Sequence, residues 1–431
     1  MATQAFEVLR GTTTIAVSGT TATITESTDY TLPTGGDSTN CFIKINNTRL
    51  TGMGDTVSGG VQNVKEFTVR IDNPGNIATS INFIRSGTPG FACRVTWEIL
   101  CYVGASGGNN EMIVRDVGLL TGSNVTSLTS AAVTGIAADG DVAVIITSQS
   151  AAANTNVDWH AALWTADWDA VNDKATFARQ GGTPVSPTNM WVSYAVLEFT
   201  GSNWSGVDRV SWTAEATTWA PGNNNNSTHS HGVTIADLAK AAVLQVQYDT
   251  DNDDTPLQDS GDAAILTSTT VFTYWNRNLV GIRTKVAWLV QNTQASGTAR
   301  NLKCQHLQYT DDTSSAPGER VFTQNFSTDP DTGTGATLVA PLGETSCSGS
   351  CSGDGAGPGI PMGSIDIRLT GTNEVTFTES FSNQERRIGL EIIEWPEDEA
   401  AAGGRIMSSL VGGGGLVSHG GIAGSRGGLV A

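Results

Sequence analysis

The feature that most constrains this chain is a pair of strand-like segments that recurs about every hundred residues. In each copy a short run is followed by a longer run rich in β-branched and aromatic residues. The copies are 81–85 with 95–102, 175–179 with 192–199, 271–275 with 286–290, and 375–379 with 388–395. With Trp97, Tyr194, Trp288 and Leu390 taken as equivalent, the spacings are 97, 94 and 102 residues. Such repetition predicts an array of similar units rather than one catalytic cleft.

Each repeat is followed by a run of small residues and then by another strand-like segment. These runs are 104–108, 200–203 and 294–298, and the segments after them are 112–115, 207–210 and 302–305. We interpret each segment as the first strand of the next unit, and 6–10 as its equivalent in the first unit. The sequence therefore predicts four modules, at 1–105, 106–203, 204–298 and 299–398, and a glycine-rich tail at 399–431.

Almost all of the remaining sequence consists of short β-branched or aromatic runs between clusters of Gly, Asn, Asp, Ser, Thr and Pro. This pattern predicts an all-β fold of tandem antiparallel β-sandwich or jelly-roll-like modules. The best candidate for a helix is 235–243, with Thr234 as its N-cap, and it would span only about two turns.

Alternation in the last strand of each repeat predicts which side chains are buried. The odd-numbered residues of 95–101 share one face of an extended strand, so we expect them in the core. The large aromatic residues Trp97, Tyr194 and Trp288 are then packing residues. Acidic residues of these strands are expected to face solvent on the other side. They are Glu98, Glu198, Glu391 and Glu394.

The chain has 431 residues, with 23 Lys or Arg against 42 Asp or Glu, so its formal net charge is −19. Such a surface repels nucleic-acid backbones and anionic membranes, and we expect neither as a partner. Residues 1–6 lack the pattern of a secretory signal, and no run of 18 apolar residues is present. We therefore expect synthesis in a cytoplasm without a signal peptide.

Six cysteines are too few for a disulfide scaffold in a chain of this length. Cys347 and Cys351 lie close together in a Gly/Ser segment, which leaves three alternatives for this pair. They are free thiols, which we expect, a local disulfide, and a metal pair.

Two groups of residues have the composition of metal sites. His229 and His231 lie at i and i+2 on one side of an extended strand, so that a trimer would place six imidazoles on its axis. The set Asp249, Asp251 and Asp253 begins like a calcium loop but departs from the EF-hand pattern. For both groups a polar loop in solvent is the expected state, and a transition metal or calcium is the alternative. No other cofactor is expected.

Patterns of the common catalytic sites are missing from the sequence. None of the five histidines lies in a nucleophile-elbow or zincin context, and the chain has neither a P-loop nor a dinucleotide fingerprint. A glycosidase would place its carboxylate pair in one location rather than once per module. We therefore expect the protein not to be an enzyme.

The tail 399–431 combines many glycines with a few spaced apolar residues. Glycine loses the most entropy on ordering, and little apolar surface is available to offset this loss. We expect the tail to be structured by another copy of the chain, through strand addition or apolar contacts; folding back onto the fourth module is the alternative. The residues expected to make these contacts are Ile406, Met407, Leu410, Leu416, Ile422 and Leu429.

The chain resembles structural proteins of tailed-bacteriophage virions. The features that carry this resemblance are the Thr/Gly/Asn-rich opening 10–17, strands such as 97–100 and 390–395, the acidic charge and the missing signal sequence. The resemblance lies in the style of the whole chain and not in a specific motif. It implies a non-enzymatic, multicopy subunit of a fibre, tail appendage or capsid decoration. Such a subunit forms a homo-oligomer or helical polymer, contacts other virion proteins, and is released by lysis in an extracellular particle.

The alternative is an adhesin that binds a host receptor or a surface glycan through loops at the ends of the sandwiches. A tryptophan cluster in the second module favours it, because Trp159, Trp164 and Trp168 have no equivalents in the other modules. Aromatic rings exposed in such a loop would stack on sugars.

Overall fold

The structure is a computed structural model. It describes residues 3–51, 65, 68–88, 90–152, 162–179, 189–214, 226–249, 262–276, 283–295, 299–311, 320–325, 337–348, 365–370, 374–379 and 384–398. Every sheet in these ranges is antiparallel, and the chain is all-β as the turn-rich sequence predicts.

Four successive stretches each contribute six described strands, and we call them modules 1 to 4. Module 1 contains β2 (Phe6–Ile15), β3 (Thr21–Thr25), β4 (Cys41–Thr51), β5 (Val69–Ile71), β6 (Ser80–Arg85) and β7 (Ala92–Tyr102). Module 2 contains β8 (Ile113–Ser123), β9 (Ser127–Thr129), β10 (Val142–Ala151), β11 (Thr165–Asp169), β12 (Lys174–Ala178) and β13 (Asn189–Glu198). Module 3 contains β14 (Trp204–Ala214), β15 (Ser227–Ser230), β16 (Ala241–Tyr248), β17 (Asp262–Ser268), β18 (Val271–Asn276) and β19 (Arg283–Asn292). Module 4 contains β20 (Lys303–Asp311), β21 (Arg320–Asn325), β22 (Thr337–Ser348), β23 (Ile365–Leu369), β24 (Glu374–Glu379) and β25 (Gln384–Glu394).

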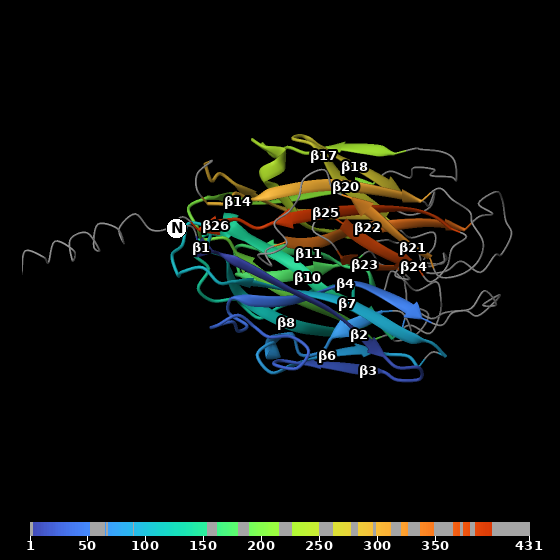
Figure 1. Cartoon of the computed structure of the whole chain (residues 1–431). Helices are drawn as coiled ribbons and strands as arrows, with labels where there is room; N and C mark the ends of the chain where they lie inside the picture. The colour runs from blue at the N-terminus through green and yellow to red at the C-terminus, as the bar shows by residue number, and fades with distance from the viewer. Residues whose placement is uncertain are drawn as a thin grey trace, which may run out of the picture.

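Within each module the strands form two three-stranded sheets with one topology. The first, sixth and third strands form what we call the inner sheet, with the sixth in the middle, as in β2-β7-β4. The second, fifth and fourth strands form the outer sheet, as in β3-β6-β5. The two strands of the sequence repeat, the fifth and the sixth, therefore lie in different sheets of one sandwich (Figure 1).

The two sheets of a module pack through aromatic side chains. Phe177 of the outer sheet contacts Tyr194 of the inner sheet in module 2, with ring centroids 5.3 Å apart. In module 4 the rings of Phe377 and Tyr309 stack at 4.9 Å across the same interface. Trp97, Tyr194 and Trp288 are all buried, so their predicted role as packing residues is confirmed.

A register irregularity marks the third strand of every module. It falls between Ile45 and Asn47, between Ile146 and Ser148, between Val243 and Gln245, and between Pro341 and Glu344. In each case the neighbouring position of the sixth strand is the residue taken as equivalent from the sequence, such as Trp97 opposite Ile45. A bulge bends and twists its strand, so the same bend recurs four times.

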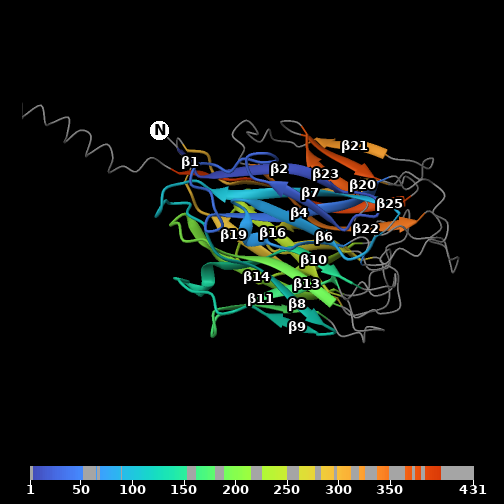
Figure 2. The same cartoon turned by 90° about the horizontal axis from the view of Figure 1, so that it is seen from below.

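The modules close into a ring rather than forming a string. Each of the third strands β4, β10, β16 and β22 contacts the next, and β22 contacts β4 again (Figure 2). The fourth strand of each module also lies against the third strand of the following one, and β23 of module 4 lies against β4 of module 1. Between modules 3 and 4 this contact is a strand pairing of β17 with β22, which joins two sheets into one of six strands.

Ring closure buries the inner sheets on both faces, and this overturns one expectation. The strand glutamates expected in solvent are 0–2 % exposed. They are Glu98, Glu198, Glu391 and Glu394. Their side lies against a neighbouring module or a connecting loop, and each carboxylate has a partner there, such as the backbone N–H of Ala137 for Glu198 at 2.6 Å. Alternation correctly identified one buried face but carried no information about the second.

The helical elements whose bounds are described are short 3-10 turns: η1 (Pro74–Asn76), η2 (Asp139–Asp141) and η4 (Leu238–Lys240). The predicted helix over 235–243 is wrong. Asp237, and not Thr234, caps the η4 turn through the N–H of Ala239, and the chain enters β16 at Ala241. None of the described helices has the length and apolarity needed to cross a membrane.

Candidate functional site

The connections between modules meet at one end of the ring, which we call the hinge end. Two short strands, β1 (Thr3–Gln4) and β26 (Glu397–Asp398), pair there and bring the two ends of the described chain together (Figure 1). An aromatic cluster lies beneath them. Phe6 stacks on Trp395 with centroids 4.6 Å apart, and Phe199 meets Trp204 at 5.2 Å. These rings come from the starts or ends of all the modules.

Asn110 is the centre of the hinge end, and its side chain is fully buried. Its Nδ2 donates to Oε1 of Gln294 at 3.2 Å and to the carbonyl of Glu397 at 2.8 Å. Its Oδ1 accepts from Nδ2 of Asn203 and of Asn292, each at 3.0 Å. One amide thus binds the connections that follow modules 2, 3 and 4, and it uses its whole hydrogen-bonding capacity.

Asp398 links the last described strand to the connection that follows module 1. Its Oδ1 accepts from the backbone N–H of Asn110 at 3.0 Å, and its Oδ2 accepts from the Tyr102 hydroxyl at 3.1 Å. Burial, together with the charge of Asp398, raises the pKa of Tyr102 far above its usual value. A Cβ at Gly108 would lie 2.6 Å from Asp398 Oδ2, so this glycine leaves room for the carboxylate. The small residues after module 1 therefore allow the chain to pack closely against Asp398, which their composition alone did not predict.

The seams between modules are polar, and each uses different groups. Between modules 2 and 3, Gln245 accepts from the N–H of Ile146 at 2.9 Å and donates to the carbonyl of the same residue at 2.7 Å. Between modules 1 and 2, Ser148 Oγ accepts from the N–H of Ile71 at 2.8 Å, and the Ser193 hydroxyl donates to its carbonyl at 2.6 Å. Each side chain thus satisfies backbone groups of a neighbouring module.

Ionisable groups form the other two seams. Between modules 4 and 1, Lys44 Nζ donates to the carbonyl of Val339 at 3.2 Å, and Glu98 accepts from its N–H at 3.3 Å. Burial lowers the pKa of Lys44 to about 8, although the charge of Glu98 opposes the shift. Between modules 3 and 4, Glu391 accepts from the Val243 N–H at 3.3 Å and pairs with His306 Nδ1 at 2.6 Å. Four chemically distinct seams disfavour wrong pairings between similar modules.

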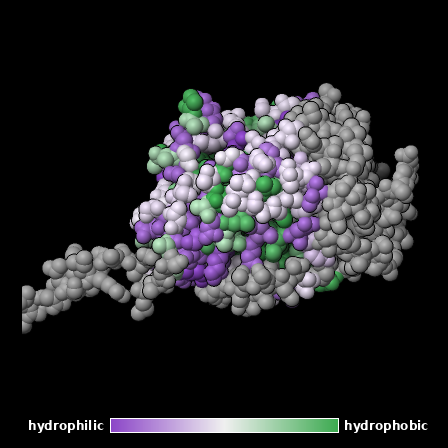
Figure 3. Space-filling model, turned by 90° about the horizontal axis from the view of Figure 1, so that it is seen from above, coloured by the Kyte–Doolittle hydropathy of each residue, from purple (hydrophilic) through white to green (hydrophobic). Residues whose placement is uncertain are grey.

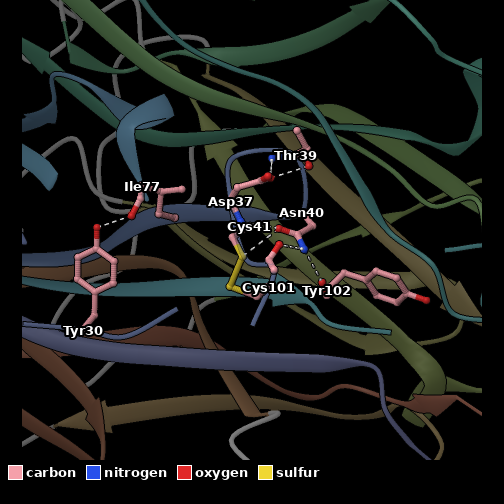
Figure 4. Close-up of a disulfide and its surroundings, with 9 residues drawn as sticks. Tyr30, Asp37, Thr39, Asn40, Cys41, Ile77, Cys101 and Tyr102 are labelled. Atoms are coloured by element: carbon pink, nitrogen blue, oxygen red, sulfur yellow. Dashed lines mark hydrogen bonds between the residues drawn. A yellow bond between two sulfur atoms is a disulfide. The ribbon is translucent and has the colours of Figure 1, made fainter. Parts of the chain in front are cut away.

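A disulfide joins Cys41 of β4 to Cys101 of β7, which are directly opposite in register (Figure 4). Next to it, Nδ2 of Asn40 donates to the carbonyl of Tyr102 at 3.2 Å. This bond was missed in the sequence, because a separation of 60 residues gives no local signal. Of the other cysteines with described side chains, Cys93 and Cys304 are free and buried. The predicted pair Cys347 and Cys351 lies outside the part whose side chains are described.

The predicted binding tryptophans do not form an exposed platform in the described ranges. Trp164 is 0 % exposed, with the Arg179 guanidinium 5.9 Å from its ring centroid, so it offers no face to a sugar. Trp168 is half-buried and donates from Nε1 to Asp139 at 3.0 Å. Trp159 lies outside the described residues. Trp164 lies in the module core, a position that composition could not distinguish from a surface loop.

The predicted metal ligands are only partly described. His229 stacks on Trp212 with centroids 5.0 Å apart, and His231 meets Phe272 edge-on at 5.5 Å. Both imidazoles thus lie on the aromatic side of β15 and not in a solvent loop, and burial lowers the pKa of each. Asp249 is buried and accepts from the N–H of Thr284 at 2.8 Å. Asp251 and Asp253 are outside the described ranges, and the described residues contain no group of three or more ligands suited to a metal.

The six tail residues predicted to mediate assembly also lie outside the described ranges. On the face shown in Figure 3, hydrophobic residues form small separate areas among hydrophilic ones. The large hydrophobic side chains exposed on the described part are Val17, Val171 and Val321. Comparison of the chain with family models, with curated proteins and with solved structures finds no match.

Proposed function

We propose that the protein is a non-enzymatic structural subunit that assembles with copies of itself into a virion or filament. The observation that carries this proposal is the β1–β26 pair. It fixes Asp398, the residue that precedes the glycine-rich tail, at the hinge end and beside the N-terminal strand. An assembly segment that begins at residue 399 would therefore start from a rigid, buried anchor.

Edge strands of the ring supply acceptors for such a segment. The first strands β2, β8, β14 and β20 are terminal in the sheet orders, and each also contacts the third strand of the preceding module in the ring. Of these, β8 runs for eleven residues, most of them half-buried. The N–H of Val114 already donates to the Thr39 carbonyl of module 1, and a partner's tail would pair with the rest of this edge by strand addition.

The Cys41–Cys101 disulfide fits an extracellular particle better than a protein that stays in a reducing cytoplasm. A virion protein made in a host cell and released by lysis would form this bond after release. Together with the closed ring and its polar seams, the disulfide supports a role as a durable building unit.

Removal of the tail tests the proposal. The full chain and a chain ending at residue 398 are compared by light scattering after gel filtration, by electron microscopy and by thermal unfolding. We expect the full chain to assemble and the shortened chain to be a folded monomer with an unchanged Tm. Normal assemblies of the shortened chain would overturn the mechanism.

A matched pair of full-length variants separates tail chemistry from tail length. Leu416→Ser, Ile422→Ser and Leu429→Ser together remove three apolar contacts, and we expect the triple variant to lose assembly. Ser408→Thr, Ser409→Thr and Ser418→Thr change the same segment without removing apolar groups and should assemble normally. Equal assembly of both triple variants would contradict a role for the apolar residues.

A further inference from the structure

The seam that closes the ring contains a cleft of about 220 Å³. Module 1 lines it with residues of β2, β4 and β7, and module 4 lines it with β23 and the residue after it. This volume lies below the usual range for drug-sized ligands, so the cleft suits a single small unit. Its walls carry guanidinium groups from both modules, because Arg10 of module 1 and Arg368 of module 4 both line it.

Three arginines share two carboxylates at this place. Arg10 Nε lies 3.4 Å from Glu98 Oε1. Asp366 Oδ2 lies 3.4 Å from Arg94 Nε and 3.1 Å from Arg368 Nε. Both carboxylates are buried, whereas the arginine side chains are 28–34 % exposed. With Glu374 at the rim and Lys44 beside Glu98 included, the described groups are four cations and three carboxylates, a surplus of one positive charge on a chain whose formal net charge is −19.

The arginine forks are positioned for a ligand. Asp366 holds the Nε side of Arg368, and within the described part of the chain no acceptor binds its two Nη groups. An oxyanion with two oxygens matches this planar pair of donors. Arg10 is anchored by Glu98 and by the carbonyl of Thr337, so the opposite wall is also fixed.

The rest of the lining matches a sugar ring. Thr12, Thr96 and Thr370 line the cleft. Thr12 Oγ1 accepts from Arg94 at 3.3 Å, the Thr96 hydroxyl donates to Asp366, and the Thr370 hydroxyl donates to Glu374 at the rim at 2.9 Å, so each oxygen keeps a lone pair for a ligand. Asn46, at the bulge of β4, also lines it, and its buried Oδ1 has no hydrogen-bond partner among the described residues. Ile367 and Leu369 add apolar surface.

We propose that this cleft binds one carboxylate-bearing sugar unit of the hexuronate class. Arg368, with Arg10 on the opposite wall, binds the carboxylate, while Asn46 Oδ1 and the threonine hydroxyl oxygens accept hydrogen bonds from the sugar hydroxyls. The surplus charge favours a monoanion, because a group with a single negative charge neutralises it. The site is independent of the tail and of self-assembly.

Isothermal titration of the full-length protein with glucuronate, glucose and acetate tests this proposal. We expect saturable binding of glucuronate, with glucose and acetate each at least about tenfold weaker, since each lacks one half of the recognised chemistry. Equal affinities for glucuronate and glucose would overturn the role of the arginines. Equal affinities for glucuronate and acetate would overturn the sugar assignment.

Variants locate the binding at this seam. Arg368→Gln should weaken glucuronate at least about tenfold, and Arg368→Lys, which keeps the charge but loses the fork, should weaken it less. Arg209→Gln is the matched control. Arg209 lies on the first strand of module 3, away from the cleft, and pairs with Asp167 at 3.1 Å. Thermal unfolding checks that each variant is folded. Unchanged glucuronate affinity in a folded Arg368→Gln variant would refute the site.

Discussion

Asn110 and Asp398 lie 288 residues apart in the sequence, yet the backbone N–H of Asn110 donates to Oδ1 of Asp398 at 3.0 Å. This bond joins the hinge after module 1 to the strand after module 4. It makes the ring a closed object, in which the first and last modules are neighbours. Most of the buried residues accordingly belong to one hydrophobic cluster that crosses the module borders.

Removal of the Asn110 side chain should destabilise the whole ring. Asn110→Ala leaves Asn203, Asn292 and Gln294 without their buried partner, so we expect a loss of about 2–4 kcal/mol in the free energy of unfolding. Urea unfolding followed by tryptophan fluorescence measures it. Asn109→Ala, at the exposed neighbouring position, is the control and should change stability by less than about 0.5 kcal/mol. Equal effects of the two substitutions would contradict the central role of Asn110.

Glycine at position 11 is required by the Trp97 ring. Gly11 lies opposite Trp97 in the β2–β7 register, and a Cβ there would overlap the indole. Gly11→Ala should therefore cost about 1–3 kcal/mol, because the ring must leave its place in the core. Nothing lies within 4 Å of a Cβ at Gly140, so Gly140→Ala is the matched control. Near-ultraviolet circular dichroism and the Tm of both variants test this. A Gly11→Ala protein with the wild-type spectrum and Tm would show that the Trp97 indole can accommodate a Cβ at position 11.

The seam between modules 2 and 3 depends on one amide. Gln245→Ala leaves both backbone groups of Ile146 without a bond across the seam, and we expect a loss of about 2 kcal/mol. Gln291→Ala is the control, since Gln291 binds Asp208 and Thr234 at the half-buried rim of module 3. Hydrogen exchange should show faster exchange at Ile146 in Gln245→Ala only. Protection at Ile146 that persists in this variant would mean that the amide is dispensable.

The His306–Glu391 pair should make stability fall as the pH rises. Burial lowers the pKa of His306, but the charge and hydrogen bond of Glu391 outweigh it and raise the net value above 6.5. Burial raises the pKa of Glu391 above 4.5. The folded state therefore binds more protons than the unfolded state across this window. The contribution of the pair is present at low pH and is lost as pH rises through the raised pKa values.

Urea midpoints between pH 5 and 8 measure this dependence. The double variant His306→Gln/Glu391→Gln should show a flatter fall than the wild type. The pKa of His229 is lowered by burial, so His229→Gln should not flatten it. Identical slopes for the wild type and the double variant would exclude the pair as the source.

Loss of the disulfide should destabilise module 1. A loop of about 60 residues is closed by Cys41–Cys101, and the chain-entropy relation gives about 4 kcal/mol for this length. Cys41→Ser/Cys101→Ser should unfold at a lower urea concentration than the wild type, and the wild type under reducing conditions should match the variant. Peptide mapping without reductant should find residues 41 and 101 linked. Recovery of Cys101 as a free thiol from the oxidised protein would contradict the bond.

The sequence by itself determined the repeat and its phase, because each sixth strand carries its own period-two pattern and one large residue at the bulge. The repeat pattern predicts that Trp97, Tyr194, Trp288 and Leu390 are equivalent, and the tertiary structure places each beside the same irregularity. The sequence also predicts which segments are strands and which face of each strand points into the sandwich, because both depend on residues close together in the chain.

Only the tertiary structure decided how the modules meet. The pattern of an isolated strand predicts that Glu98 and Glu391 face solvent. In the structure both are buried and accept hydrogen bonds from strands of other modules, up to 241 residues away in the chain. Asn110, Cys41 and Arg368 likewise acquire their roles from partners that no local pattern specifies. A single strand encodes which of its faces is apolar, whereas what covers the other face depends on the closure of the whole ring.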